Sequence, residues 1–138
     1  MTDLSKDIID KLILKAHAMQ QLSYAPYSGF NVGAALLTAD DEIYGGCNIE
    51  NAAFSPTICA ERTAIFKAVS EGKGDFRAIA IVGGEKGEIG DFCFPCGVCR
   101  QVLAEFCDPD SFQIITRNRD GETVMHSLRE LLPESFSL

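Results

Sequence analysis

The chain lacks the features that place a protein in a membrane or on a nucleic acid. No stretch reaches the roughly 18 consecutive apolar residues that a membrane-spanning helix needs. No run of Lys or Arg occurs, and 12 basic against 20 acidic side chains give a net charge of −8, which repels phosphate polymers. The first residues are acidic where a signal peptide is basic. We therefore expect a cytoplasmic protein with neither a membrane nor a nucleic acid as partner.

Repeats, linkers and low-complexity tracts are also missing from the 138 residues. A chain of this length fits one compact domain that buries roughly 68% of the surface of its unfolded form. We therefore expect a single domain over residues 1–138. Six cysteines in a cytoplasmic protein are more typical of metal ligands or buried thiols than of disulfides. We expect Cys47, Cys93 and Cys107 to be small buried hydrophobes.

The hydrophobic pattern predicts alternating helices and strands. Apolar residues at three- and four-residue steps over 4–22, behind the possible N-cap residues Thr2 and Ser5, predict an amphipathic helix. Further helical patterns begin near Cys59, at Cys96 and in a capping box at Ser127. Strands are predicted at 32–37, 43–48, 78–82, 112–116 and 123–126. The order predicts an α/β fold in which helices cover a mixed sheet.

Three thiols and one carboxylate form the most informative pattern, in Cys-Ala-Glu-Arg at 59–62 and Pro-Cys-Gly-Val-Cys-Arg at 95–100. Both groups fall at predicted helix starts, where the helix dipole lowers the pKa of a thiol. Helix starts in strand-loop-helix units gather at the carboxyl ends of the strands, so Cys59, Cys96 and Cys99 can meet. Three soft ligands suit zinc and leave the fourth position for water. This pattern is typical of a catalytic zinc site.

Other interpretations of these residues stay open at this point. The thiols could be buried structural groups, ligands of a structural zinc, or a redox dithiol. Glu61 could act as a general acid and base, or could only complement the helix dipole. Three thiolates leave a zinc site with a charge of −1, so Arg62 and Arg100 are candidates to donate hydrogen bonds to sulfur.

Together with Tyr-Ser-Gly-Phe-Asn-Val-Gly-Ala-Ala-Leu at 27–36 and Cys-Asn-Ile-Glu-Asn-Ala at 47–52, these motifs resemble the small, homotetrameric, three-cysteine cytidine deaminases. The resemblance extends over about 24–136. It implies a three-layer α-β-α sandwich with a mixed five-stranded sheet. It also implies hydrolytic deamination of cytidine and deoxycytidine to uridine and deoxyuridine, with release of ammonia, in pyrimidine salvage.

The resemblance assigns roles to the residues of the metal motifs. It implies that Cys59, Cys96 and Cys99 hold Zn²⁺. Glu61 would carry protons between water, the base and the departing amine. Arg62 would donate hydrogen bonds to the thiolates.

The resemblance likewise implies a nucleoside pocket that neighbouring subunits complete. Asn48 and Glu50 would bind the ribose 3′-hydroxyl, and Phe30 would pack beside the pyrimidine. The backbone N–H of Ala60 would bind the carbonyl oxygen of the base. Phe136 would stack on the base from a neighbouring subunit.

Two further functions remain as alternatives. A related aminonucleoside deaminase, such as one acting on blasticidin S, shares the zinc motifs but resembles this chain less at 48–50 and Phe30. A non-enzymatic zinc-binding interaction module is the second. Phe54 stands where many cytidine deaminases have Tyr, which leaves any polar role there in doubt. Because cytidine and deoxycytidine both have the 3′-hydroxyl, the sequence does not distinguish between them.

Overall fold

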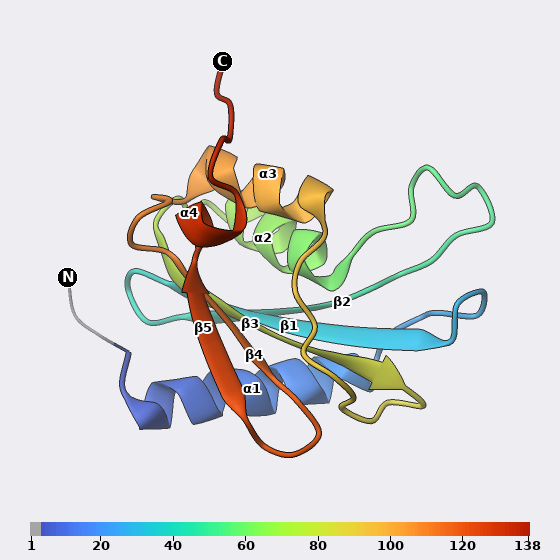
Figure 1. The fold of residues 1–138 in the computed structure, drawn as a ribbon. Coiled ribbons are helices and arrows are strands. Elements are labelled where there is room, and N and C mark those ends of the chain that lie inside the picture. The colour runs from blue at the N-terminus through green and yellow to red at the C-terminus, as the bar shows by residue number, and fades with distance from the viewer. Residues whose placement is uncertain (1–3) are drawn as a thin grey trace.

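The computed structural model describes residues 4–138, in which four helices alternate with five strands (Figure 1). In chain order they are α1 (Lys6–Gln20), β1 (Phe30–Thr38), β2 (Ile43–Cys47), α2 (Ala60–Ser70), β3 (Phe76–Glu85), α3 (Gly97–Phe106), β4 (Gln113–Arg117), β5 (Thr123–Ser127) and α4 (Leu128–Leu131). This is the predicted order. The hydroxyl of Ser5 caps α1 by accepting from the backbone N–H of Ile8, whereas Thr2 lies outside the described residues. Among residues 4–138, no helix combines the length and apolar character that a membrane crossing requires.

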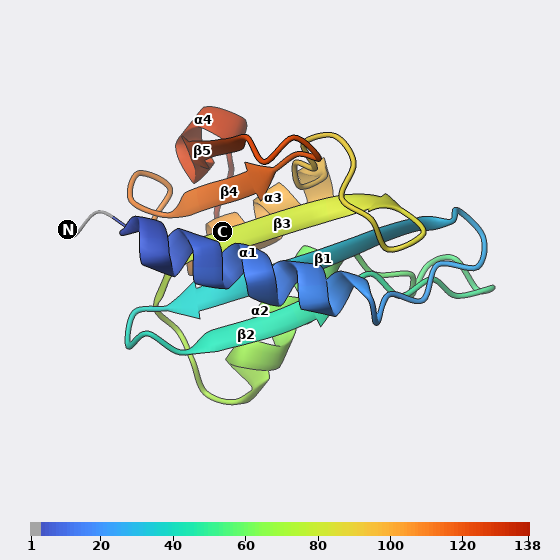
Figure 2. The same ribbon diagram turned by 90° about the horizontal axis from the view of Figure 1, so that it is seen from below.

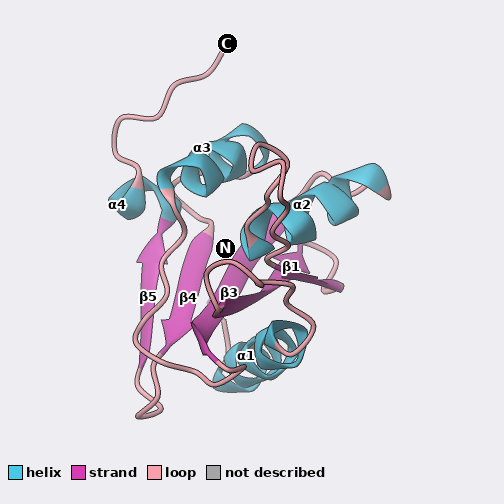
Figure 3. Cartoon of the chain, turned by 90° about the vertical axis from the view of Figure 1, so that its right-hand side faces the viewer, coloured by secondary structure: helices cyan, strands magenta, loops and turns pink. Residues whose placement is uncertain are grey.

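The five strands form one mixed sheet in the order β2-β1-β3-β4-β5 (Figure 2). Strand β1 pairs antiparallel with β2 and β3, β3 pairs parallel with β4, and β4 pairs antiparallel with β5. Helix α1 covers one face of the sheet, and α2, α3 and α4 lie on the other (Figures 1 and 3). The predicted three-layer α-β-α sandwich is therefore confirmed.

Strand β3 contributes to two hydrophobic cores, because successive side chains of a strand point to opposite faces. Ile79 and Ile81 belong to the core beneath α2 and α3. Ala78, Ala80 and Val82 belong to the core beneath α1. A strand buried on both faces is apolar without alternation, which explains the continuous apolar run at 78–82.

Two glycines allow the helices to approach the sheet closely. A Cβ atom added to Gly33 of β1 would lie 1.9 Å from the carbonyl oxygen of Ala16 in α1. One added to Gly46 of β2 would lie 2.5 Å from the backbone nitrogen of Ala64 in α2. These contacts fix the height of each helix above the strands, and with it the position of the start of α2.

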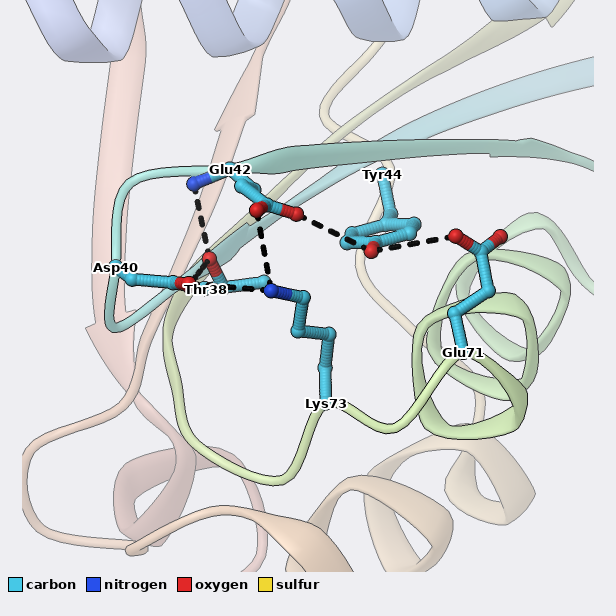
Figure 4. A network of polar contacts seen from close by, with 6 residues as sticks. All are labelled: Thr38, Asp40, Glu42, Tyr44, Glu71 and Lys73. Atoms are coloured by element: carbon cyan, nitrogen blue, oxygen red, sulfur yellow. Dashed lines mark hydrogen bonds and ion pairs between the residues drawn. The ribbon is translucent and has the colours of Figure 1, made fainter.

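A polar network joins the β1–β2 turn to the end of α2 (Figure 4). The ammonium of Lys73 lies 3.1 Å from the carboxylates of both Asp40 and Glu42. The hydroxyl of Tyr44 bridges Glu42 and Glu71, at 3.3 and 3.4 Å. Because the carboxylates are largely exposed, solvent screens these ion pairs and leaves them little net stabilising effect. The network therefore organises this turn and makes only a small contribution to the stability of the fold.

We predict that Gly33→Ala destabilises the fold by about 1–3 kcal/mol or more, because the added methyl group meets the backbone of α1 and cannot be accommodated by a side-chain rotation. Thermal and urea unfolding at one protein concentration measure the effect. Gly74→Ala is the matched control, since a Cβ atom there meets nothing within 4 Å. Equal unfolding free energies for the two variants would contradict this account of the α1 packing.

Candidate active site

Two predicted metal ligands are the residues at which helices begin. Cys59 is the N-cap of α2 (φ −79°, ψ 156°), and Cys96 is the N-cap of α3 (φ −67°, ψ 167°). The helical pattern of the sequence predicts Cys59 in the first turn, but Cys59 precedes α2 by one residue, since an N-cap keeps extended angles. Cys99 lies in the first turn of α3 and is fully buried. Neither sulfur accepts a capping hydrogen bond from the backbone of its helix, so capping does not occupy the atoms that a metal would bind.

The three sulfurs are spaced as ligands of one zinc ion. The Sγ atom of Cys96 lies 3.7 Å from that of Cys59 and 3.5 Å from that of Cys99, and all three lie within 4.8 Å of one another. Sulfurs bound at about 2.3 Å to a tetrahedral zinc would be about 3.8 Å apart. Helices α2 and α3 are neighbours on one face of the sheet (Figure 3), which brings together residues 37 positions apart. The chemistry and the spacing of these donors fit Zn²⁺.

Positive charge reaches this sulfur cluster from Arg62. Its Nη2 atom donates to the sulfur of Cys59 at 3.4 Å, and this bond raises the pKa of the guanidinium further above its usual value. A zinc ion with three thiolates carries a charge of −1, which opposes ionisation of a bound water. Arg62 and the two helix N-termini counteract that charge.

Arg100 makes different contacts from those that the sequence suggests. Its guanidinium donates to the carbonyl oxygens of Pro95 and Leu131, both at 2.7 Å. The hypothesis that Arg100 donates to a thiolate is therefore wrong. These two bonds instead tie the residue that precedes Cys96 to the end of α4.

Hydrogen bonds to Cys59 favour its thiolate form. The thiol of Cys99 and the guanidinium of Arg62 both donate to this sulfur and lower the pKa of Cys59 to about 5. Cys99 keeps its proton as the donor, so its pKa lies above the usual value. Zinc must displace such protons from its ligands, so metal binding here releases protons and strengthens as pH rises.

Glu61 is a buried carboxyl beside the sulfurs. Its side chain is 4% exposed. Burial raises the pKa of Glu61 to about 7, and the charge of Cys59 adds to the shift. A pKa near the working pH suits a group that accepts and returns a proton in one catalytic cycle. Burial and this raised pKa suit acid/base chemistry, and the role of Glu61 stays a prediction.

A pocket of about 230 Å³ opens beside Glu61 and the sulfur cluster. Asn48 and Glu50, from the segment after β2, line it together with Ala60 at the start of α2. The carboxylate of Glu50 accepts from the backbone N–H groups of Tyr27 and Ser28, and hydrogen bonding from Ser28 lowers its pKa. The N–H of Ala60 belongs to the first turn, where a helix offers no partner. The pocket thus combines a fixed anion with a helix N-terminus.

Two predicted aromatic residues lie outside the lining of this pocket in the described subunit. Phe30 lines a separate hollow formed with the loop after β3, and its ring lies with the thiol of Cys93 against Gly83. Phe136 is 67% exposed on the outer side of α2 and α3, where Gln101 donates to its carbonyl oxygen at 2.8 Å. Their roles toward a base remain predictions.

Sequence reasoning missed two residues of the pocket wall. Cys93 and Phe94 both line the pocket, although Cys93 was expected to be a small buried hydrophobe like Cys47 and Cys107. Cys47 and Cys107 are indeed buried, whereas Cys93 is half-buried. The signal that identifies Cys93 and Phe94 is their position shortly before Cys96 in the sequence. A loop that leads into an N-cap residue that binds a metal must pass beside the metal site.

Comparisons with known proteins agree with this geometry. The sequence model of the family described as the cytidine and deoxycytidylate deaminase zinc-binding region matches residues 6–114. A cytidine deaminase of Sporosarcina psychrophila is 48% identical over 129 residues, which are 94% of this chain and 91% of the relative. A cytidine deaminase of Halalkalibacterium halodurans is 46% identical over 126 residues, which are 91% of this chain and 92% of the relative.

The fold agrees as well. A crystal structure of cytidine deaminase from Burkholderia pseudomallei superposes with a TM-score of 0.84 at 41% sequence identity, covering 96% of this chain and 100% of that one. The mixed sheet, the cluster of three sulfurs and the matches over nearly the whole chain lead to one conclusion. The chain belongs to the cytidine and deoxycytidylate deaminase family and has the three-cysteine form of its zinc site.

Proposed function

We propose that this protein catalyses the zinc-dependent hydrolytic deamination of cytidine and deoxycytidine to uridine and deoxyuridine, a reaction of pyrimidine salvage. The observation that carries the proposal is the buried carboxyl of Glu61, which lies in a pocket beside three sulfurs spaced for one zinc ion. The names of the relatives supply the substrate class.

The reaction adds the oxygen of water to C4 of cytosine, breaks the bond from C4 to the exocyclic nitrogen and releases ammonia. When bound, zinc supplies the nucleophile by lowering the pKa of a water. Glu61 accepts the proton that this water loses and delivers it to N3 of the base. In the second half, Glu61 accepts the proton of the new hydroxyl group on C4 and transfers it to the departing amine, so that the C4 carbonyl forms as the bond to nitrogen breaks. A pKa of about 7 for Glu61 makes both transfers accessible near neutral pH.

The polar groups of the pocket suit an uncharged nucleoside. The N–H of Ala60 would bind the carbonyl oxygen of the base, and Asn48 and Glu50 would bind the ribose 3′-hydroxyl. The lowered pKa of Glu50 keeps this carboxylate ionised, so that it accepts a hydroxyl proton and repels a phosphate group at the same place. Phe30 would pack beside the pyrimidine.

We further propose that the protein works in the cytoplasm as a single-domain homotetramer whose subunits complete one another's pockets. The pocket volume of about 230 Å³ falls below the roughly 300–1,000 Å³ of enclosed small-molecule sites. Exposed Phe136 on the outer side of α2 and α3 supports a role as the neighbour's stacking residue. A reducing compartment keeps the ligand thiols from forming disulfides.

We predict that Glu61→Gln keeps zinc and fold but lowers kcat by at least 10²- to 10⁴-fold, the usual contribution of a general acid and base. Loss of the cytidine ultraviolet band by zinc-replete protein measures turnover, and blasticidin S as substrate tests the related deaminase activity. Glu71→Gln, at the exposed end of α2, is the control and should behave as the unmodified protein. Near-normal turnover by Glu61→Gln would overturn the role of this carboxyl.

We predict that Cys96→Ala loses zinc and with it all activity, because two sulfurs cannot replace a three-ligand site. Elemental analysis measures the metal, and X-ray absorption of the unmodified protein should show three sulfurs and one lighter ligand. Cys107→Ala, outside the sulfur cluster, should keep stoichiometric zinc. Retained zinc in Cys96→Ala, or a shell of four sulfurs, would identify a different ligand set.

The tetramer proposal predicts complementation between two defective subunits. Phe136→Ala should raise KM for cytidine, and Glu61→Gln should lack turnover. After the two proteins are unfolded, mixed and refolded together, some pockets combine an intact Glu61 with an intact Phe136 from the neighbour. Turnover at low cytidine concentration should then exceed the sum of the separately refolded proteins. A strictly additive rate would show that Phe136 does not act across subunits.

A further inference from the structure

The orientation of the Asn48 side-chain amide is fixed by two backbone groups, one of which can only donate and the other only accept a hydrogen bond. Its oxygen accepts from the backbone N–H of Val32 at 2.9 Å, and its nitrogen donates to the carbonyl oxygen of Phe30 at 2.8 Å. A backbone N–H only donates and a carbonyl only accepts. The two ends of the amide therefore cannot exchange places without breaking both bonds.

The hydroxyl of Ser23 gives the Asn48 oxygen a second donor, at 2.5 Å. A hydroxyl could also act as the acceptor, but here its direction is set by Asn31. The side-chain nitrogen of Asn31 donates to the oxygen of Ser23 at 3.1 Å. Because Ser23 accepts from Asn31, its own hydrogen goes to Asn48.

The direction of the Asn31 amide is fixed in the same manner. The backbone N–H of Gly87 donates to the oxygen of Asn31 at 3.0 Å. The buried side-chain amide of Gln20 in α1 donates to the backbone carbonyl oxygens of Asn31 and Glu88, at 3.1 and 2.9 Å, and so joins β1 to the same loop. A directed series of hydrogen bonds therefore runs from the loop after β3, through Asn31 and Ser23, to Asn48.

This series decides what Asn48 presents to the pocket. The amide oxygen already accepts two hydrogen bonds, and one of the two N–H groups of the amide already donates one. The second N–H group is therefore what Asn48 offers to the pocket. The carboxylate of Glu50, which lines the same pocket, can only accept. A hydroxyl group both accepts and donates, and is the partner that matches such a pair.

We propose that Ser23 and Asn31 are positioning residues for the nucleoside: they keep Asn48 turned as a donor to the ribose 3′-hydroxyl and so determine how strongly this hydroxyl contributes to binding. This inference rests on the proposed function. The inference adds two residues to the proposed function: Ser23, which bonds to Asn48, and Asn31, which bonds to Ser23. Neither needs to touch the substrate.

The test compares cytidine with 3′-deoxycytidine in Ser23→Ala, Ser23→Thr and Asn31→Asp. Asn31→Asp keeps the shape of the side chain and the oxygen that accepts from Gly87, but a carboxylate cannot donate to Ser23. The hydroxyl of Ser23 then donates to this carboxylate instead of to Asn48. Ser23→Ala and Asn31→Asp should raise KM for cytidine by about 3- to 10-fold, the effect of losing one hydrogen bond, with kcat unchanged. With 3′-deoxycytidine, both should match the unmodified protein. Ser23→Thr should restore the affinity for cytidine, since it keeps the hydroxyl.

Calorimetric binding of uridine and 3′-deoxyuridine gives the same comparison without turnover. Ser70→Ala, which removes an exposed hydroxyl that bonds to the backbone of α2, is the control and should change neither ligand's affinity. Equal losses for the 3′-hydroxyl and 3′-deoxy ligands would overturn the positioning role, because a general disturbance of the pocket does not depend on that hydroxyl. Unmodified protein that deaminates cytidine but does not distinguish the two ligands would overturn it too. Absence of both turnover and uridine binding would overturn the proposed function as well.

Discussion

The meeting of two helix N-termini is the constraint on which the rest of the site depends. A single helix start can offer sulfurs such as Cys96 and Cys99, but the third ligand must come from another element. Close approach of α2 to the sheet, which Gly46 permits, brings Cys59 to the same point. The dipoles of both helices then oppose the negative charge of the thiolates. The metal site, the buried carboxyl of Glu61 and the pocket all depend on this packing of α2 and α3.

Backbone groups also fix the orientation of two polar side chains that line the pocket, Asn48 and Glu50. Phe30 and Val32 belong to β1, and their peptide groups orient the amide of Asn48. The peptide N–H groups of the turn before β1 hold the carboxylate of Glu50. Backbone in a sheet or a tight turn cannot rotate, so side chains bound to it are held in place before a ligand arrives. Such preorganisation reduces the entropy that binding would otherwise cost.

Much of the fold and of the metal site could be predicted because it depends on local patterns. Strand β3 is a continuous apolar run, the capping box of Ser127 and Glu130 forms with both of its bonds, and the cysteine motifs mark helix starts. The contacts of Arg100 could not be predicted, since its partner Leu131 is 31 positions away in the sequence. The same holds for Cys93, whose place in the pocket wall depends on the path of a loop, and for the long-range bond from Gly87 to Asn31.

The pocket wall contains a third thiol, that of Cys93, whose position has a consequence for the metal. Cys93 lines the same pocket as Cys59 and Cys96, yet only Cys59, Cys96 and Cys99 cluster as metal ligands within the described residues. The sulfur of Cys93 is not within 4.8 Å of all three of those sulfurs, so its position keeps it out of the cluster. Four sulfurs around zinc would form a closed, structural site. By holding Cys93 apart from the other three sulfurs, this loop leaves a site of three thiols, which would leave a position for water on a bound zinc ion, as in catalytic sites.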